Sequence, residues 1–299
     1  MLRQAVITDE ISPDFRRAVA FAEKHGLRAV ELRSAWDRPP QSLGAAQVQQ
    51  IKAVLADSSV RVCAIASSFF HCDPDSRAEV ELHLDILKRC LALGREIDCS
   101  LVRGFAFRRR GPADPRWSAA AGRFAAALPI LESAGAVLAL ENDPATFVSA
   151  GRDLRRFLHE LRSPRVRALW SPANTFADMA AGESPYPDGY RAVEEQIVHI
   201  HLKDGVRSPG GFQPCLFGAG GVDYAGLLGE LWENSYGGYL ALEPQGRALG
   251  PGDGEAATAA ALENLRRLIE KLSPEESAAS AADARAARRG PPVVSPPGY

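Results

Sequence analysis

The sequence has few cysteines and almost no net charge, and each shortage argues against a class of protein. The five cysteines among 299 residues are odd in number and lack CxxC or Cys/His spacing, which predicts reduced thiols rather than a disulfide framework. A formal net charge of −2 gives no electrostatic reason to expect nucleic acid or an anionic membrane as a partner. We therefore expect neither.

Targeting segments and common catalytic fingerprints are also missing. The N-terminus, MLRQAVITDEIS, has an apolar part too short for a signal peptide. No run of about 18 apolar residues occurs, and no nucleophile elbow, Walker loop or dinucleotide fingerprint stands between a strand and a helix. These absences predict a cytoplasmic location and direct attention to other kinds of site.

What the chain does contain is a strand and helix pair repeated along its length. Uniformly apolar runs such as QAVIT, AVEL, VRVCAIA and VLALE are expected of parallel strands covered on both faces. Helix signals separate them, including one helix over residues 115–133 and one capped by Asp223 after a Gly-rich loop. Eight such pairs predict an α/β fold, a (β/α)8 TIM barrel forming a single domain over residues 1–272.

The composition changes after Leu272. Residues 273–299 carry no apolar periodicity, and their Ala, Ser and Pro content cannot bury enough surface to offset the entropy of ordering them. This segment is predicted to be a disordered Ala/Pro-rich tail. Docking of residues 291–299 on a partner or a neighbouring subunit is the alternative.

Four of the apolar runs end on a polar residue. Glu141, Ser171, His201 and Glu243 are 30, 30 and 42 residues apart, about one strand, helix and loop per step. Because the carboxyl ends of barrel strands converge on one face, we expect these side chains to share a pocket. Two carboxylates and an imidazole are suitable ligands for Mn, Mg, Co or Zn. A single Glu in such a place is more often a helix-start charge, but three residues at barrel spacing favour a common site.

The motifs ENDP, SPANTF, HIHLKDG and LALEPQG, with ITDEIS and GLRAVELR, resemble the xylose isomerase-like TIM-barrel superfamily. This group of sugar phosphate isomerases and epimerases is related to AP endonuclease family 2, and the resemblance covers residues 1–272. It implies a metal held by Glu141, position 171, His201 and Glu243. The family has Asp where this chain has Ser171, so we expect three protein ligands and a divalent metal that binds weakly.

The resemblance also implies a mechanism. Moving a proton on the carbon beside a carbonyl needs a base, a conjugate acid and a cation that stabilises the enediolate oxygen. Glu141 and Glu243 would flank the substrate and exchange protons with it. The expected function is a metal-dependent isomerase or epimerase of a small sugar or sugar phosphate. A dehydratase on the same barrel is one alternative, and a sugar-binding protein that lost its metal site through Ser171 is another.

Five further residues are candidates for substrate binding: Lys203, Asn174, Arg33, Arg103 and His71. Lys203 could bind a hydroxyl or phosphate, or be an ordinary solvated charge. Arg33 and Arg103 lie on strands where either could meet an anionic group. His71 could line the pocket or belong to a surface loop.

Strand alternation turns two more polar residues inward. His199, two positions before His201, is predicted to form a hydrogen bond in the core, and Glu31 could bind a hydroxyl or support Arg33. The sequence leaves open which sugar is used and whether the protein forms a homo-oligomer.

Overall fold

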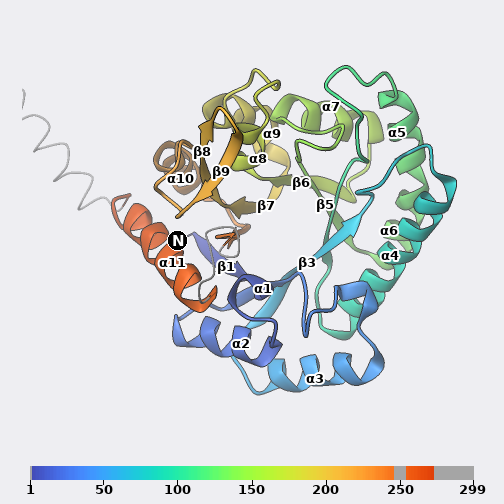
Figure 1. Ribbon diagram of the computed structural model, residues 1–299. Coiled ribbons are helices and arrows are strands. Elements are labelled where there is room, and N and C mark those ends of the chain that lie inside the picture. The colour runs from blue at the N-terminus through green and yellow to red at the C-terminus, as the bar shows by residue number, and fades with distance from the viewer. Residues whose placement is uncertain (1, 246–253, 273–299) are drawn as a thin grey trace, which may run out of the picture.

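The computed structural model describes residues 2–245 and 254–272. Within them, eight parallel strands close into a barrel surrounded by helices (Figure 1). The strands are β1 Arg3–Ile7, β2 Ala29–Leu32, β3 Arg61–Phe69, β4 Leu101–Gly104, β5 Val137–Glu141, β6 Val166–Trp170, β7 Ile197–Leu202 and β10 Tyr239–Leu242. Pairing of β1 with both β2 and β10 closes the sheet. The predicted TIM barrel is confirmed, and the predicted tail lies outside the described residues.

Helices connect successive strands and cover the outside of the barrel. The longer ones are α2 Phe15–Lys24, α3 Ala45–Ala56, α4 Arg77–Glu96, α7 Gly151–Leu161, α10 Tyr224–Glu233 and α11 Gly254–Glu270. The shorter ones are α1 Thr8–Ile11, α5 Trp117–Phe124, α6 Leu128–Ala134, α8 Pro172–Ala177 and α9 Tyr190–Val193, with single turns at η1 Pro40–Ser42, η2 Ala125–Ala127, η3 Pro185–Gly189 and η4 Glu194–Gln196. None of the helices in the described ranges is long and apolar enough to cross a membrane.

Polar side chains fix where the helices begin. Asp223 caps α10 as predicted, because its carboxylate accepts a hydrogen bond from the Gly226 amide at 2.8 Å. Asp14 caps α2 in the same way. The single helix predicted over residues 115–133 is instead divided into α5, η2 and α6. Pro129 explains the division, since it has no amide proton and lies in the first turn of α6.

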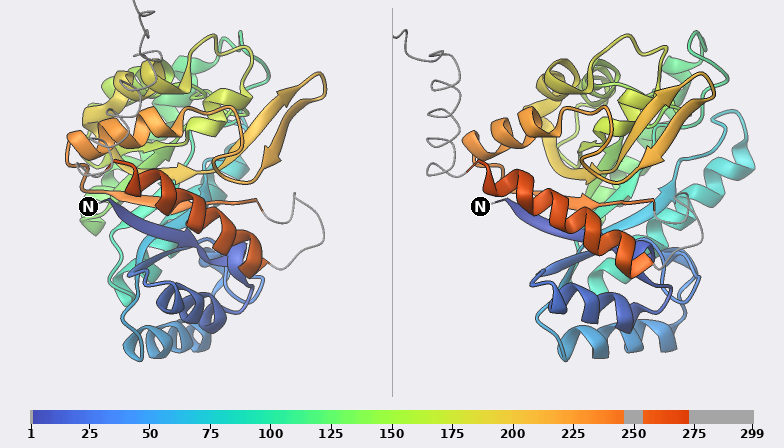
Figure 2. Two further views of the ribbon diagram at one scale, coloured as in Figure 1. Left: turned by 90° about the vertical axis from the view of Figure 1, so that its left-hand side faces the viewer. Right: turned by 60° about the vertical axis from the view of Figure 1, so that its left-hand side comes forward.

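The segment after β7 differs from the Gly-rich loop that was predicted. It first forms an antiparallel hairpin, β8 Asp204–Ser208 with β9 Gly211–Cys215, which projects from the barrel (Figure 2). Gly211 adopts φ 104° at the tip, a conformation that favours glycine. The Gly-rich stretch itself follows the hairpin and leads to α10.

The barrel strands bury side chains on both faces. Along β1, Val6 packs in the main core with residues of the helices, whereas Ala5 and Ile7 join a separate small cluster with Ala29 and Ala241. Since neighbouring residues of a strand point to opposite sides, this second cluster fills the barrel interior. Glu31 shares the inward phase of Ala29, so it enters the same interior closer to the C-terminal ends of the strands.

Candidate active site

Charged side chains gather at the C-terminal ends of the strands. Glu141 is the last residue of β5, His201 lies near the end of β7, and Glu243 directly follows β10. Their side chains are 2%, 0% and 10% exposed. A buried charge is costly unless it is paired, so the contacts of each group decide what the site can do.

Glu141 contacts a histidine, an amide and a guanidinium. Its Oε1 lies 3.2 Å from His201 Nδ1 and accepts a hydrogen bond from Asn174 Nδ2 at 3.2 Å. Its Oε2 accepts one from Arg103 Nη1 at 3.2 Å. Burial alone would raise the pKa of Glu141, but His201, Arg103 and Lys203 together lower it. Glu141 is therefore a carboxylate at neutral pH.

Glu243 is held by two cations. Its Oε1 accepts a hydrogen bond from Arg33 Nη1 at 2.6 Å, and its Oε2 accepts one from Lys203 Nζ at 2.8 Å. Burial opposes ionisation, but the charges of Lys203, His201 and Arg33 lower the pKa of Glu243 to about 2. The Lys203 ammonium also lies 4.0 Å from Glu141 Oε1, so it stands between the two candidate catalytic carboxylates.

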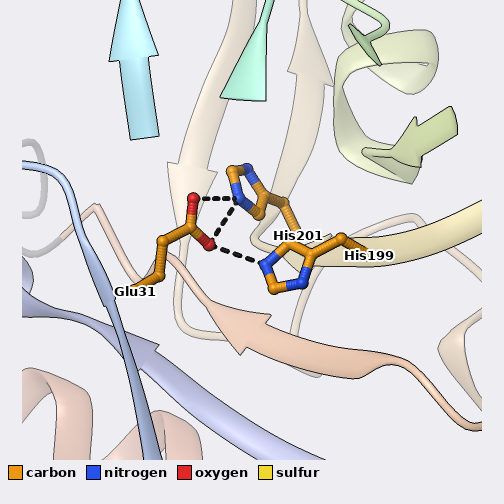
Figure 3. A group of neighbouring side chains, drawn as sticks. All are labelled: Glu31, His199 and His201. Carbon is orange, nitrogen blue, oxygen red and sulfur yellow. Dashed lines mark hydrogen bonds and ion pairs between the residues drawn. The ribbon is translucent and has the colours of Figure 1, made fainter. Parts of the chain in front are cut away.

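Glu31 lies between two imidazoles in the barrel interior (Figure 3). His199 Nε2 is 2.7 Å from Glu31 Oε2, and His201 Nε2 is 3.0 and 2.9 Å from the two oxygens of Glu31. Burial by itself lowers the pKa of His201, yet Glu31 and Glu141 raise it to about 9. The core hydrogen bond predicted for His199 is thus present, and the carboxylate of Glu31 contacts histidines instead of Arg33.

Ser171 directly follows β6, which pairs with β7 through Trp170 and Ile200. The side chain of Asn142 fixes the backbone of Ser171. It accepts a hydrogen bond from the Ser171 amide at 2.8 Å and donates one to the Ser171 carbonyl at 2.9 Å. The Ser171 hydroxyl is buried, and among the described residues it has no hydrogen-bond partner. A neutral, unpaired oxygen therefore occupies the place where the family resemblance implies a carboxylate.

The predicted substrate-binding residues separate into two groups. Lys203, Arg33, Arg103 and Asn174 all bond to Glu141 or Glu243. Lys203 is 7% exposed, so the alternative that it is an ordinary solvated charge is wrong. His71 has other partners: its side chain is 35% exposed and 3.9 Å from Asp143, and its ring contacts Phe105, which packs against the Arg103 guanidinium.

Two acidic residues of α1 that the sequence motifs did not single out also contact Arg33. Arg33 Nε donates to Asp9 Oδ1 at 2.9 Å, and its Nη2 donates to Glu10 Oε1 at 2.5 Å. These bonds orient the guanidinium toward Glu243. The motif ITDEIS could have indicated them, because both acids lie within three residues of the end of β1 and hence at the C-terminal end of the barrel.

Glu141, His201 and Glu243 are suitable metal ligands. Each offers one donor atom, and these atoms lie within 4.8 Å of one another. With His201 Nε2 directed at Glu31, Nδ1 is the nitrogen that would bind a cation once it has released its proton, and carboxylates with imidazole suit Mn, Mg, Co or Zn. Lys203 contacts the same carboxylate oxygens that face Nδ1, so its ammonium would compete with a divalent cation.

A second group of donors, Glu31, His199 and His201, also falls within 4.8 Å. Its nitrogen–oxygen distances of 2.7 to 3.0 Å match direct hydrogen bonds. We therefore interpret this group as hydrogen-bonded support for His201.

The fold and the site together define a (β/α)8-barrel protein whose strand ends hold buried glutamates and a histidine. The chain belongs to the xylose isomerase-like TIM barrel family, whose profile matches residues 19–268. This confirms the resemblance found in the sequence motifs. A search of curated proteins finds no significant match.

Solved structures share the fold at low sequence identity. An IolI protein with a bound zinc atom is 16% identical, with a TM-score of 0.73 over 91% of this chain and 100% of that one. A D-allulose 3-epimerase from Methylomonas sp. is 16% identical, with a TM-score of 0.70 over 89% and 96%. The probable 3-DHS dehydratase AsbF from Bacillus anthracis is 14% identical, with a TM-score of 0.67 over 87% and 97%.

Proposed function

We propose that this protein is a divalent-metal-dependent isomerase or epimerase of a small sugar or sugar derivative, acting by proton transfer through an enediolate. One observation carries the proposal: carboxylate oxygens of Glu141 and Glu243 lie 3.2 and 3.8 Å from the same atom, His201 Nδ1. Two carboxylates that converge on one point can serve opposite faces of a bound carbon. The family and its epimerase neighbours support this reading.

Glu141 and Glu243 form the proposed acid–base pair. One carboxylate removes the proton from the carbon beside the carbonyl, and a carboxyl group returns a proton to give the isomer or epimer. With Lys203 and Arg33 bonded to it, Glu243 is a weak base, since its pKa is about 2. A substrate oxygen that accepts the Lys203 hydrogen bond would release one of these contacts and make Glu243 more basic.

Glu141, His201 and Glu243 are the residues that would hold the cation. When bound, a divalent cation stabilises the negative charge that develops on the enediolate oxygen. Arg33, Arg103 and Lys203 keep the carboxylates ionised and oriented, and Lys203 has protons to donate to a substrate hydroxyl or phosphate. Burial of the group excludes water, which strengthens these interactions.

Deuterium exchange tests the proposal directly. The protein, supplied with Mn²⁺ in D2O, is incubated with D-allulose and with a panel of other ketoses and ketose phosphates. We expect NMR and mass spectrometry to show solvent deuterium on the carbon beside the carbonyl of at least one sugar, together with its isomer or epimer. Glu243→Gln should lower the rate by about 10²–10⁴-fold because an amide cannot accept the proton.

The control for this variant is Glu132→Gln, which makes the same chemical change at a side chain that is 67% exposed. It should leave the rate unchanged. Full activity in Glu243→Gln would remove Glu243 from the mechanism. Exchange by no member of the panel would count against the isomerase or epimerase function.

A dehydratase is the second candidate. The Lys203 ammonium lies 2.8 Å from Glu243, so an acid and a base stand side by side, as the removal of a hydroxyl beside a carbonyl requires. Mass spectrometry of the same reactions separates the two functions. A product lighter by one water molecule would indicate the dehydratase.

A further inference from the structure

Glu31 and His199 are buried beside His201, but neither of them bonds directly to Glu141 or Glu243. Glu31 comes from β2, and both histidines come from β7, so the carboxylate crosses the barrel interior to reach them (Figure 3). All three side chains are 0% exposed. No solvent can replace these contacts if they are broken, so the identities of the donors and acceptors matter.

The hydrogen bonds of Glu31 determine which imidazole nitrogens carry protons. An ionised carboxylate can only accept hydrogen bonds, so the contacts at 2.7 Å to His199 Nε2 and at 2.9 Å to His201 Nε2 require a proton on each Nε2. The other nitrogen of His201, Nδ1, lies 3.2 Å from the carboxylate of Glu141, so by the same rule it carries a proton in the metal-free protein and must release it to bind a cation. His199 Nδ1 is buried and, within the described residues, has no partner, which suits a nitrogen without a proton.

We infer that Glu31 is a positioning residue that holds His201 with Nδ1 toward Glu141 and Glu243, and that His199 tethers the carboxylate of Glu31 in turn. The role in metal binding rests on the proposed function, whereas the hydrogen-bond arrangement does not. A histidine ligand that donates its second N–H to a carboxylate is fixed in orientation and binds metal better. Here the carboxylate is itself fixed by a second histidine.

Glutamine at position 31 would break this arrangement without changing its size. The amide oxygen accepts hydrogen bonds, but the amide nitrogen can only donate. Both Nε2 atoms contact Glu31 Oε2, so an amide oxygen at that place could accept from both, but the amide N–H at the place of Oε1 would face the Nε2 proton of His201 at about 3.0 Å. His201 must then turn away from the amide or give up its Nε2 proton, and the buried site offers no water to absorb the mismatch.

The first measurement is a long-range ¹H–¹⁵N correlation spectrum of the metal-free wild-type protein. We expect slowly exchanging Nε2–H signals from both His199 and His201, assigned by replacing each histidine in turn. Glu31→Gln should shift or lose the His201 signal, since His201 is the imidazole that also contacts Oε1. Asp178→Asn is the matched control, since Asp178 is a buried carboxylate that pairs with Arg109 at 2.6 Å, and it should keep both signals.

The second measurement is Zn²⁺ affinity by titration against a competing chelator. Glu31→Gln should bind zinc about 10–100-fold more weakly than wild type, as is typical when the partner of a ligating histidine is removed. Glu31→Asp, which keeps the carboxylate on a shorter side chain, should recover part of this affinity. Asp178→Asn should match wild type.

The outcomes separate the inference from the proposed function. A wild-type spectrum with His201 protonated only on Nδ1, or a folded Glu31→Gln that keeps both signals and wild-type zinc affinity, would overturn the positioning role. The wild-type spectrum decides this even if Glu31→Gln does not fold. Absence of turnover with both Nε2–H signals present would instead contradict the proposed function and leave the role of Glu31 standing.

Discussion

Replacing Ser171 by aspartate should create the fourth ligand that the family resemblance implies at this position. The Ser171 hydroxyl is buried and lacks a partner within the described part of the chain, and the backbone there is held by Asn142. A longer, charged side chain would therefore start from a fixed main chain. It would extend from the end of β6, next to the strand that carries His201.

The charges in the site set the expected gain in the free energy of cation binding. A unit negative charge about 4 Å from a divalent cation contributes about 8 kcal/mol at an effective dielectric constant of about 20. Removing the new carboxylate from water costs several kcal/mol of this, and the ammonium of Lys203, which contacts Glu141 and Glu243, opposes binding of the cation. We expect a net gain of at least about 1.4 kcal/mol, which is a tenfold tighter Kd.

Isothermal titration of Mn²⁺ into chelator-treated protein measures this change. Wild type, Ser171→Asp and Ser171→Asn are compared, because asparagine adds nearly the same volume without the charge. We expect the aspartate variant to bind at least tenfold tighter than both others. If Ser171→Asp binds no tighter than Ser171→Asn, position 171 does not face the cation, and its assignment from the family is wrong.

Two further predictions concern neighbours of the same site. Lys203→Met should tighten Mn²⁺ binding at least about tenfold, since it removes an ammonium that lies 2.8 Å from Glu243. The control is Lys52→Met, at a lysine that is 41% exposed and pairs with Glu96. Unchanged affinity in Lys203→Met would show that Lys203 does not compete with the cation. The pKa of His201 is raised from 6.5 to about 9. Protonated His201 therefore stabilises the folded state fully below pH 6.5, and this contribution to the free energy of unfolding, on the order of 3 kcal/mol, is lost as the pH rises through about 9. Urea unfolding of metal-free protein across this range should show the loss, and a folded His201→Gln with the same slope would contradict it.

The barrel could be predicted because its strands are buried on both sides. Runs such as VLALE remain apolar without interruption, and this property depends only on local sequence. The hairpin β8–β9 could not be predicted, since its short, partly exposed strands contain glycine and proline. Contacts with a distant helix support it: Arg207 Nε donates to the Phe176 carbonyl at 2.7 Å, and Phe212 packs against the Phe176 ring.

For the candidate site, the sequence predicted which residues lie at the strand ends, but not which buried charges pair with one another. Strand ends converge in any such barrel, so spacing alone was enough to bring Glu141, His201 and Glu243 together. The partner of a buried charge follows no spacing rule. Arg33 and Glu243 are 210 residues apart and Glu31 and His199 are 168 apart, so only the closed barrel shows that they meet.

The two ends of the hairpin β8–β9 differ in their surroundings. Its base begins at Asp204, directly after Lys203, and Asp204 accepts hydrogen bonds from the amides of Gly218 and Gly220 at 3.0 and 2.9 Å. Its tip, between Ser208 and Gly211, extends away from the barrel (Figure 2). Exposed tips of this kind accept inserted sequence. The tip is thus the natural place to graft a peptide tag, a fluorophore or an immobilisation handle, because the ladder between tip and base keeps the added segment away from the buried charges.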